Sequence, residues 1–225
     1  MKKLIEGLRK FQTEIFPAHE QLFARLAGGQ QPSTLFITCA DSRVVPDLFT
    51  QAEPGELFVI RNAGNIVPAY GRFPGGVTAT IEFAVAALGV RDIVICGHTD
   101  CGVIDGLLHP ERLSGMPSVA AWLEQAAATR QVAAEIHKGS GLTEPQLLEA
   151  LVRENVLTQL RNIQTHPAVA AGLAGERLSL HGWVYDIRTG GVEAFDSDEH
   201  RFVLIDGSYV PKALPAFRKS GYVPD

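Results

Sequence analysis

Two short stretches of the sequence carry side chains of the types that bind a soft or borderline metal ion. The first contains Cys39 and Asp41, and the second contains His98 and Cys101. Two thiols, an imidazole and a carboxylate suit Zn²⁺, which prefers tetrahedral sulfur and nitrogen ligands. Cys39 and Asp41 are two residues apart, so both side chains can point the same way from an extended segment. A tight turn can likewise aim His98 and Cys101 at one ion, and the spacing therefore predicts a zinc site.

The alternative for each cysteine alone is a small apolar side chain in the core. We adopt that interpretation for Cys96, which lies inside a predicted strand. Cys39, His98 and Cys101 together favour the metal site. The sequence has neither the paired CxxC knuckles of structural zinc nor a redox CxxC. It also has no P-loop, no GxGxxG after a strand and no GxSxG elbow.

Both stretches directly follow predicted strands. Apolar, β-branched runs predict strands at 34–38, 56–60, 92–96 and 177–185, with a hairpin partner at 192–195. Helical spacing predicts helices at 77–88, 118–134 and 143–164, the first of them buried on most sides. This alternation indicates an α/β fold with a central, mostly parallel sheet, an antiparallel edge strand and flanking helices. The carboxyl ends of parallel strands are where such sheets bind ligands.

The ends of the chain differ from this pattern. Residues 1–28 have amphipathic helical spacing, so we expect an N-terminal helical arm in two pieces interrupted by Pro17. The proline-containing segment 211–225 predicts a C-terminal tail on the surface or on a partner. We detect no repeat or linker, and we expect a single domain over 1–225.

Composition excludes several classes of function. The 225 residues carry a formal net charge of −5, which argues against nucleic-acid binding and against an anionic membrane surface. No apolar run is long enough for a transmembrane helix, and the N-terminus lacks the pattern of a signal peptide. Three cysteines in a chain this long indicate a reducing compartment. We therefore expect a cytoplasmic protein, with the interior of a bacterial microcompartment as an alternative.

Three motifs, taken together, resemble one family. They are Thr38–Arg43 (TCADSR), Arg61–Asn65 (RNAGN) and Gly97–Gly102 (GHTDCG), supported by 54–62 and His181–Tyr185. These motifs, in this order, resemble the β-class carbonic anhydrases over about residues 11–195. The resemblance is to the bacterial, cyanobacterial and plant branch, including the anhydrase that accompanies cyanase.

The resemblance implies one Zn²⁺ per chain, held by Cys39, His98 and Cys101. It implies reversible hydration of CO₂ to bicarbonate and a proton, by attack of zinc-bound hydroxide on CO₂. Asp41 and Arg43 are the implied catalytic pair. Asp41 is a zinc ligand only in a closed form, in which its pairing with Arg43 is broken.

The resemblance also implies a substrate pocket. Gln30 matches an amide that binds the substrate, Gly102 offers a backbone N–H, and Phe58, Ala63 and Phe83 match an apolar wall. Phe83 replaces a tyrosine that is common in the family, so a hydroxyl is missing. For Phe58 and Phe83, plain core packing is an equally good interpretation.

Some bacterial members of the family have a non-catalytic bicarbonate site built from a tryptophan, an arginine and a tyrosine. Arg61 and Tyr185 match the last two positions, but Phe36 replaces the tryptophan. Loss of the tryptophan removes an N–H donor, and we expect an open, constitutively active site. The family implies self-association as dimers, tetramers or octamers. Two other functions stay open on sequence alone: a COS or CS₂ hydrolase on the same zinc framework, and a non-catalytic zinc scaffold.

Overall fold

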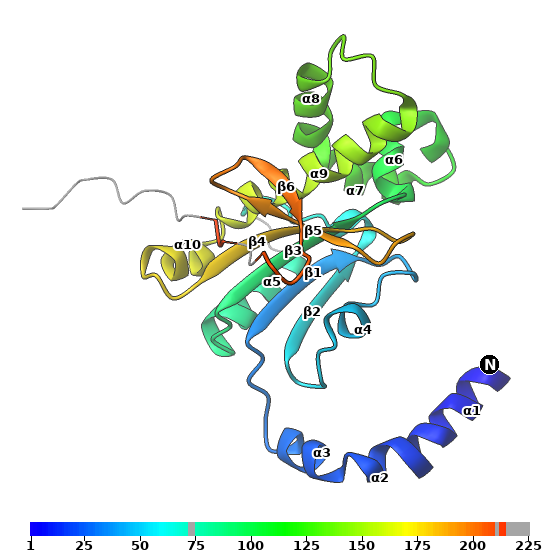
Figure 1. Ribbon diagram of the computed structural model, residues 1–225, viewed down its shortest axis with the longest axis vertical. Coiled ribbons are helices and arrows are strands. Elements are labelled where there is room, and N and C mark those ends of the chain that lie inside the picture. The colour runs from blue at the N-terminus through cyan, green and yellow to red at the C-terminus, as the bar shows by residue number, and fades with distance from the viewer. Residues whose placement is uncertain (72–74, 210–211, 215–225) are drawn as a thin grey trace, which may run out of the picture. The chain divides into compact units, whose positions relative to one another are not determined.

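A computed structural model describes residues 1–71, 75–209 and 212–214 (Figure 1). Its internal contacts divide the chain into two units, Met1–Gln31 and Pro32–Asp225. The second unit contains the whole sheet and all the sequence motifs. Of the expected tail at 211–225, only 212–214 lie within the described residues.

Six strands form one sheet in the order β2-β1-β3-β4-β5-β6. The strands are β1 (Thr34–Cys39), β2 (Leu57–Asn62), β3 (Asp92–His98), β4 (Ser179–Tyr185), β5 (Val192–Asp196) and β6 (Arg201–Leu204). The first four pair in parallel, and β5 and β6 pair antiparallel at one edge. This confirms the predicted mixed sheet, with β6 as an addition. The sequence did not predict β6 because it is only four residues long and follows a charged turn.

Along the chain, helices alternate with the strands, and several of them lie outside the ranges predicted as helical. In the second unit they are α4 (Pro46–Thr50), η2 (Ala63–Asn65), α5 (Gly76–Glu82), η3 (Phe83–Ala87), α6 (Gly102–Leu108), η4 (Pro110–Leu113), α7 (Pro117–Leu123), η5 (Glu124–Ala126), α8 (Ala127–Ile136), α9 (Glu144–Ile163) and α10 (Pro167–Ala174). Thr143 and Gln146 form a capping box at the start of α9, which agrees with the helix predicted to begin at 143. The helix predicted at 143–164 ends at Ile163, and Pro167, expected only as a stop signal after it, also starts α10, because proline suits the first position of a helix.

The helix α9 packs closely on one face of the sheet. A Cβ atom added to Gly97 on β3 would lie 2.9 Å from Val156, and one added to Gly182 on β4 would lie 2.7 Å from Leu160. The two glycines therefore allow the helix backbone to approach these strands. Alternate strand residues point to the opposite face, where Phe36 packs near Trp183.

The segment predicted as a helix at 77–88 forms α5 and the π turn η3. Thr78, Ile81 and Ala84 are buried, but Phe83 is 50% exposed. The expectation of burial on most sides is therefore wrong for this chain by itself. Phe83 follows the buried Ile81 by two residues, which places it on roughly the opposite side of a helix with 3.6 residues per turn.

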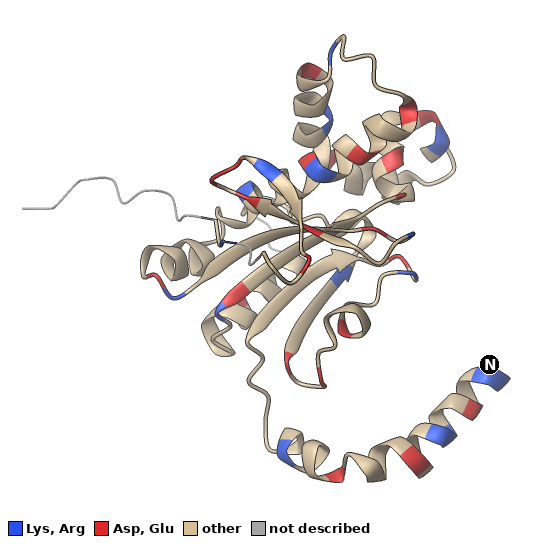
Figure 2. Ribbon diagram, in the orientation of Figure 1, with Lys and Arg blue, Asp and Glu red and all other residues tan. Residues whose placement is uncertain are grey.

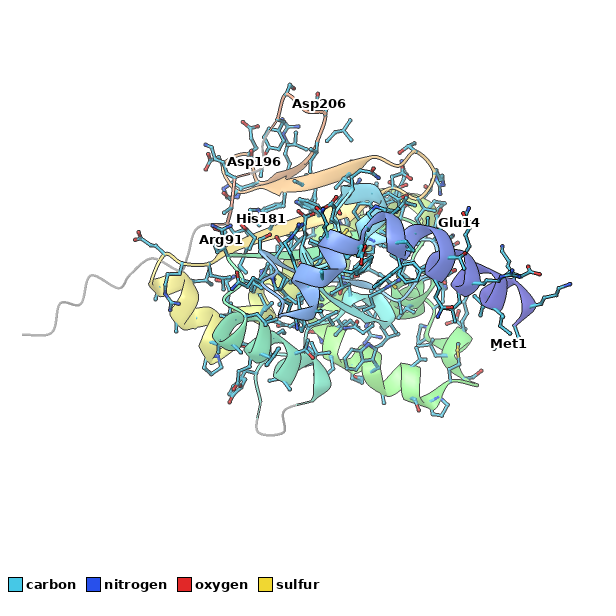
Figure 3. The ribbon with its side chains drawn as sticks, turned by 90° about the horizontal axis from the view of Figure 1, so that it is seen from below. Met1, Glu14, Arg91, His181, Asp196 and Asp206 are labelled. Atoms are coloured by element: carbon cyan, nitrogen blue, oxygen red, sulfur yellow. The ribbon has the colours of Figure 1, made fainter. Side chains whose placement is uncertain are left out.

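The unit Met1–Gln31 is helical, with α1 (Lys2–Lys10), η1 (Phe11–Ile15), α2 (Phe16–Ala18) and α3 (Glu20–Ala27). The helical path runs through Pro17 and breaks at His19, where φ is −117°. None of these helices has a buried residue. Charged residues of both signs lie along the unit (Figure 2 and Figure 3). Within the described ranges, none of the helices meets the length and hydropathy needed to cross a bilayer.

Candidate metal centre

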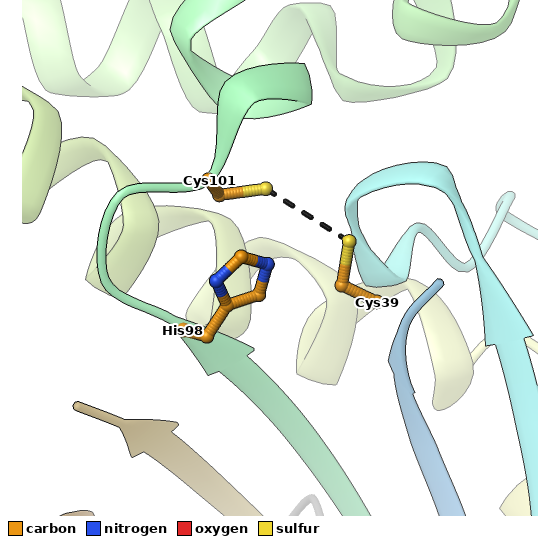
Figure 4. A group of neighbouring side chains, drawn as sticks. All are labelled: Cys39, His98 and Cys101. Carbon is orange, nitrogen blue, oxygen red and sulfur yellow. Dashed lines mark hydrogen bonds between the residues drawn. The ribbon is translucent and has the colours of Figure 1, made fainter. Parts of the chain in front are cut away.

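The three predicted metal ligands meet at the carboxyl ends of β1 and β3 (Figure 4). Cys39 is the last residue of β1, His98 is the last residue of β3, and Cys101 caps the N-terminus of α6. All three side chains are buried, and their ligand atoms lie within 4.8 Å of one another. The parallel pairing of β1 with β3 therefore brings together residues 62 positions apart in the sequence.

The geometry of these atoms fits a zinc ion. The two Sγ atoms are 4.0 Å apart, close to the roughly 3.8 Å that tetrahedral Zn–S bonds of about 2.3 Å require. His98 Nδ1 lies 2.8 Å from the Thr99 carbonyl oxygen. A carbonyl only accepts, so Nδ1 carries the proton and Nε2 presents a lone pair. His98 Nε2 is buried without a hydrogen-bond partner, which is costly unless a metal ion occupies that position.

The electrostatics of the two thiols also favour a cation. The hydrogen bond with Cys101 is the largest cause lowering the pKa of Cys39, ahead of contributions from His98 and the backbone N–H of Gly64. The hydrogen bond with Cys39 and burial raise the pKa of Cys101. The pair by itself therefore disfavours a second negative charge, and a dication at this position would stabilise both thiolates.

Asp41 and Arg43 form a bidentate ion pair beside the ligands. Arg43 Nε donates to Asp41 Oδ1 at 2.9 Å, and Arg43 Nη2 donates to Oδ2 at 2.7 Å. The Arg43 backbone N–H also donates to Oδ1 at 2.9 Å. These hydrogen bonds hold the pKa of Asp41 well below its usual range. Asp41 Oδ2 is 3.9 Å from His98 Nε2, so the carboxylate borders the metal position.

Arg61 fixes the backbone that carries this pair. Its guanidinium donates to the carbonyl oxygens of Cys39, Asp41 and Val44 at 3.2, 2.7 and 2.7 Å. Three backbone carbonyls at the end of β1 and in the loop after it are therefore held by one rigid, planar guanidinium group. The loop after β1 is held in place by a side chain from β2.

The residues expected to line a substrate pocket are only partly together. The Phe58 and Phe83 rings lie 6.1 Å apart, and Gly102 begins α6 directly after Cys101. The Ala63 carbonyl accepts a hydrogen bond from the Trp122 indole at 2.8 Å. Gln30 belongs to the separate unit Met1–Gln31.

Sequence reasoning missed the residues that support the ligands from behind. Gly64 donates its backbone N–H to Cys39 Sγ at 3.4 Å. An amide ladder on α9, formed by the buried Asn155 and Gln159 and the half-buried Asn162, holds the loop that contains Gly64. Asn155 donates to the Gly64 carbonyl at 3.0 Å, and Gln159 accepts from the Val67 backbone at 2.9 Å. The signal available in the sequence was a run of amides on the apolar face of a helix. The buried Cys96 behaves as expected, since burial raises its pKa to about 12.

Comparisons with known proteins agree with this geometry. The family model described as carbonic anhydrase matches residues 34–192. A carbonic anhydrase of Pseudomonas aeruginosa is 54% identical over 205 residues, covering 91% of this chain and 92% of that protein. The structure of the β-carbonic anhydrase CcaA matches with a TM-score of 0.87 and 48% identity, over 92% of both chains. One of two tetrameric β-carbonic anhydrases from Sordaria macrospora matches with a TM-score of 0.76 and 30% identity, over 86% of this chain and 97% of the other.

Proposed function

The chain belongs to the β-class carbonic anhydrases, and we propose from this premise how its own residues perform the family's reaction. The reaction is the reversible, zinc-dependent hydration of CO₂ to bicarbonate and a proton, which makes the enzyme a lyase. Cys39, His98 and Cys101 are suited to hold the zinc ion. When bound, Zn²⁺ supplies a Lewis acid that lowers the pKa of water at its open coordination position towards about 7.

The Asp41–Arg43 pair keeps that coordination position open. Both carboxylate oxygens of Asp41 accept hydrogen bonds from Arg43, so turning the carboxylate onto the metal would break a bidentate ion pair. Asp41 Oδ2 borders the metal position and can accept a hydrogen bond from the reacting water, which orients that water toward CO₂. The observation that carries this proposal is the intact pair beside the three buried ligands.

The remaining pocket residues have simpler roles. CO₂ is small and apolar, so the Phe58 and Phe83 rings and Ala63 suit the wall of its pocket. The Gly102 N–H belongs to the first turn of α6, where no carbonyl of the same helix reaches it, so it suits donation to a bicarbonate oxygen. Gln30 remains the amide donor that the family resemblance implies.

Self-association and location complete the proposal. The half-exposed Phe83 and the helical arm without buried residues support burial of both against another copy of the chain, as a dimer or a larger assembly. Tetramers occur among the Sordaria relatives. A reducing compartment keeps the thiol ligands from oxidising, which supports a cytoplasmic location. A role in carbon utilisation follows from CO₂ and bicarbonate as the proposed substrate and product.

The test is zinc analysis coupled to stopped-flow CO₂ hydration against pH, for the wild type, Asp41→Asn and Arg43→Ala. We expect one zinc per chain in all three, with kcat/KM reduced about 10–100-fold in the variants, as is typical for residues that orient a metal site. Cys101→Ser is the matched variant that should lose zinc as well. Full hydration activity of zinc-loaded Arg43→Ala would contradict the proposed role of the pair. Parallel COS hydrolysis assays separate the alternative substrate, since COS turnover without CO₂ hydration would overturn the main function.

A further inference from the structure

A second ion pair lies behind the metal ligands. We define the metal turn as residues 98–101, which carries His98 and Cys101, and the hairpin turn as residues 186–191, which joins β4 to β5. Arg188 of the hairpin turn binds the Asp100 carboxylate with both ends of its guanidinium. Arg188 Nη2 lies 2.8 and 2.9 Å from the two carboxylate oxygens, and Nε lies 3.1 Å from Oδ2.

This second pair is connected to the first through the backbone of Asp100. The Asp100 carbonyl oxygen accepts a hydrogen bond from Arg43 Nη2 at 3.2 Å, and the same Nη2 donates to Asp41 at 2.7 Å. The contacts therefore run from Arg188 to Asp100, to Arg43 and then to Asp41. Among the described residues, no other series of hydrogen bonds connects the hairpin turn to the Asp41–Arg43 pair.

A separate set of contacts ties the hairpin turn to the carbonyl that orients the His98 ring. Thr99 donates its backbone N–H to the Tyr185 carbonyl at 3.0 Å and its hydroxyl to Asp186 at 3.3 Å. The hydroxyl accepts from the Ile187 backbone at 3.1 Å. Because the Thr99 carbonyl accepts from His98 Nδ1, the hairpin turn fixes the residue that sets the direction of the imidazole.

The backbone of the metal turn needs such support. Asp100 has a φ of +55°, in the left-handed region that residues with a Cβ rarely adopt. The side chains of Arg188 and Asp100 are 62% and 43% exposed, and exposed ion pairs contribute little to global stability. A bidentate pair at an exposed position can still fix direction, since a guanidinium and a carboxylate meet in one plane.

We propose that Arg188 is a positioning residue, which holds Asp100 in its left-handed conformation and thereby fixes the metal turn and the donor Nη2 of Arg43. This inference rests on the proposed function of the Asp41–Arg43 pair. Arg188 is placed to act through Asp100, because its side chain binds the Asp100 carboxylate and, among the described residues, no metal ligand. Its loss should loosen the site while leaving the fold intact.

The first experiment compares Arg188→Ala with Arg188→Lys and with the matched control Arg201→Ala. Arg201 forms an exposed pair with Glu199 in the neighbouring hairpin, away from the metal turn. We expect Arg188→Ala to release zinc to a chromophoric chelator about tenfold faster and to lower kcat/KM for CO₂ about tenfold, at the low end of effects from residues behind metal ligands. Lysine keeps the charge without the fork and should restore these values only in part. Arg201→Ala should match the wild type, and all variants should unfold at nearly the same urea concentration.

The second experiment asks whether Arg188 acts through the backbone of Asp100. Glycine adopts a positive φ without strain, so Asp100→Gly should keep the metal turn in place without the clamp. We therefore expect Arg188→Ala to have no further effect on zinc release in the Asp100→Gly background. An undiminished effect in that background overturns the proposal, as does zinc release by Arg188→Ala within twofold of the Arg201→Ala control.

The two readouts separate this inference from the proposed function. If the wild type does not hydrate CO₂, the proposed function fails, and zinc release still decides the role of Arg188. If the wild type is active and Arg188→Ala behaves like the control, only the positioning role fails.

Discussion

The metal centre is supported on two sides by contacts of opposite character. Behind Cys39 lies the amide ladder of α9, in which Asn155 and Gln159 are 1% and 0% exposed. Behind Cys101 lies the exposed pair of Asp100 and Arg188. One support is neutral and buried, and the other is charged and open to solvent.

The difference indicates a division of labour. A buried amide that loses its partner leaves an unsatisfied polar group, which costs about 1–3 kcal/mol. An exposed ion pair contributes about 0–1 kcal/mol. The ladder should therefore determine the stability of the fold, whereas the ion pairs should determine where the reactive groups point.

The largest effect on stability should come from Gln159→Leu. This change removes Gln159 Oε1, which accepts from the buried Val67 N–H at 2.9 Å, and Gln159 Nε2, which donates to Asn155 Oδ1 at 2.8 Å. We expect the free energy of unfolding to fall by about 2–4 kcal/mol, measured by urea denaturation. The control Gln164→Leu loses a hydrogen bond to the Leu160 carbonyl within the same helix and should change stability by about 0.5 kcal/mol or less. A large loss of kcat/KM per zinc-loaded molecule in Gln159→Leu would break the proposed division.

A smaller loss is expected where α9 meets β4. In Gly182→Ala the new methyl group would lie 2.7 Å from Leu160 Cδ1 and 3.0 Å from Val156 Cγ1. Such overpacking costs about 1–3 kcal/mol, which thermal unfolding would detect. Gly115→Ala is the control, because nothing lies within 4 Å of its Cβ position. Equal melting temperatures for the two variants would show that this contact relaxes freely.

The smallest effect concerns the pH dependence of stability and involves a buried histidine. His166 is 2% exposed, and burial lowers its pKa from the ordinary 6.5. The unfolded chain therefore binds a proton at this position more readily than the folded chain does. The stability that neutral His166 contributes is present above about pH 6.5 and declines as the pH falls below it. Urea unfolding at about pH 8 and about pH 5.5 should show a smaller acid loss for His166→Gln than for the wild type. Equal acid losses in both proteins would contradict this assignment.

The sequence predicted the parts of the site that depend on residue type and strand position. Cys39, His98 and Cys101 could be placed together because parallel strands end at one edge of a sheet. The contact of Arg188 with Asp100 could not be predicted, because it depends on the length and twist of a hairpin outside the motifs. The amide ladder depends on which face of α9 meets the loop after β2, and periodicity does not reveal that. The strand β6 and the helices α4, α6 and α10 were missed because they are short.

The pairing of β1 with β3 also bears on the order of events during folding. The two thiols are 62 residues apart, and they meet only when two parallel strands with β2 between them in sequence have paired. Non-local parallel pairing is a slow step, because loop entropy is lost before contacts compensate for it. We therefore expect metal affinity to appear late in folding, in contrast to small zinc domains whose folding is driven by the ion. A chain emerging from the ribosome can capture its ion only after residue 101 has been made and the sheet has assembled around it.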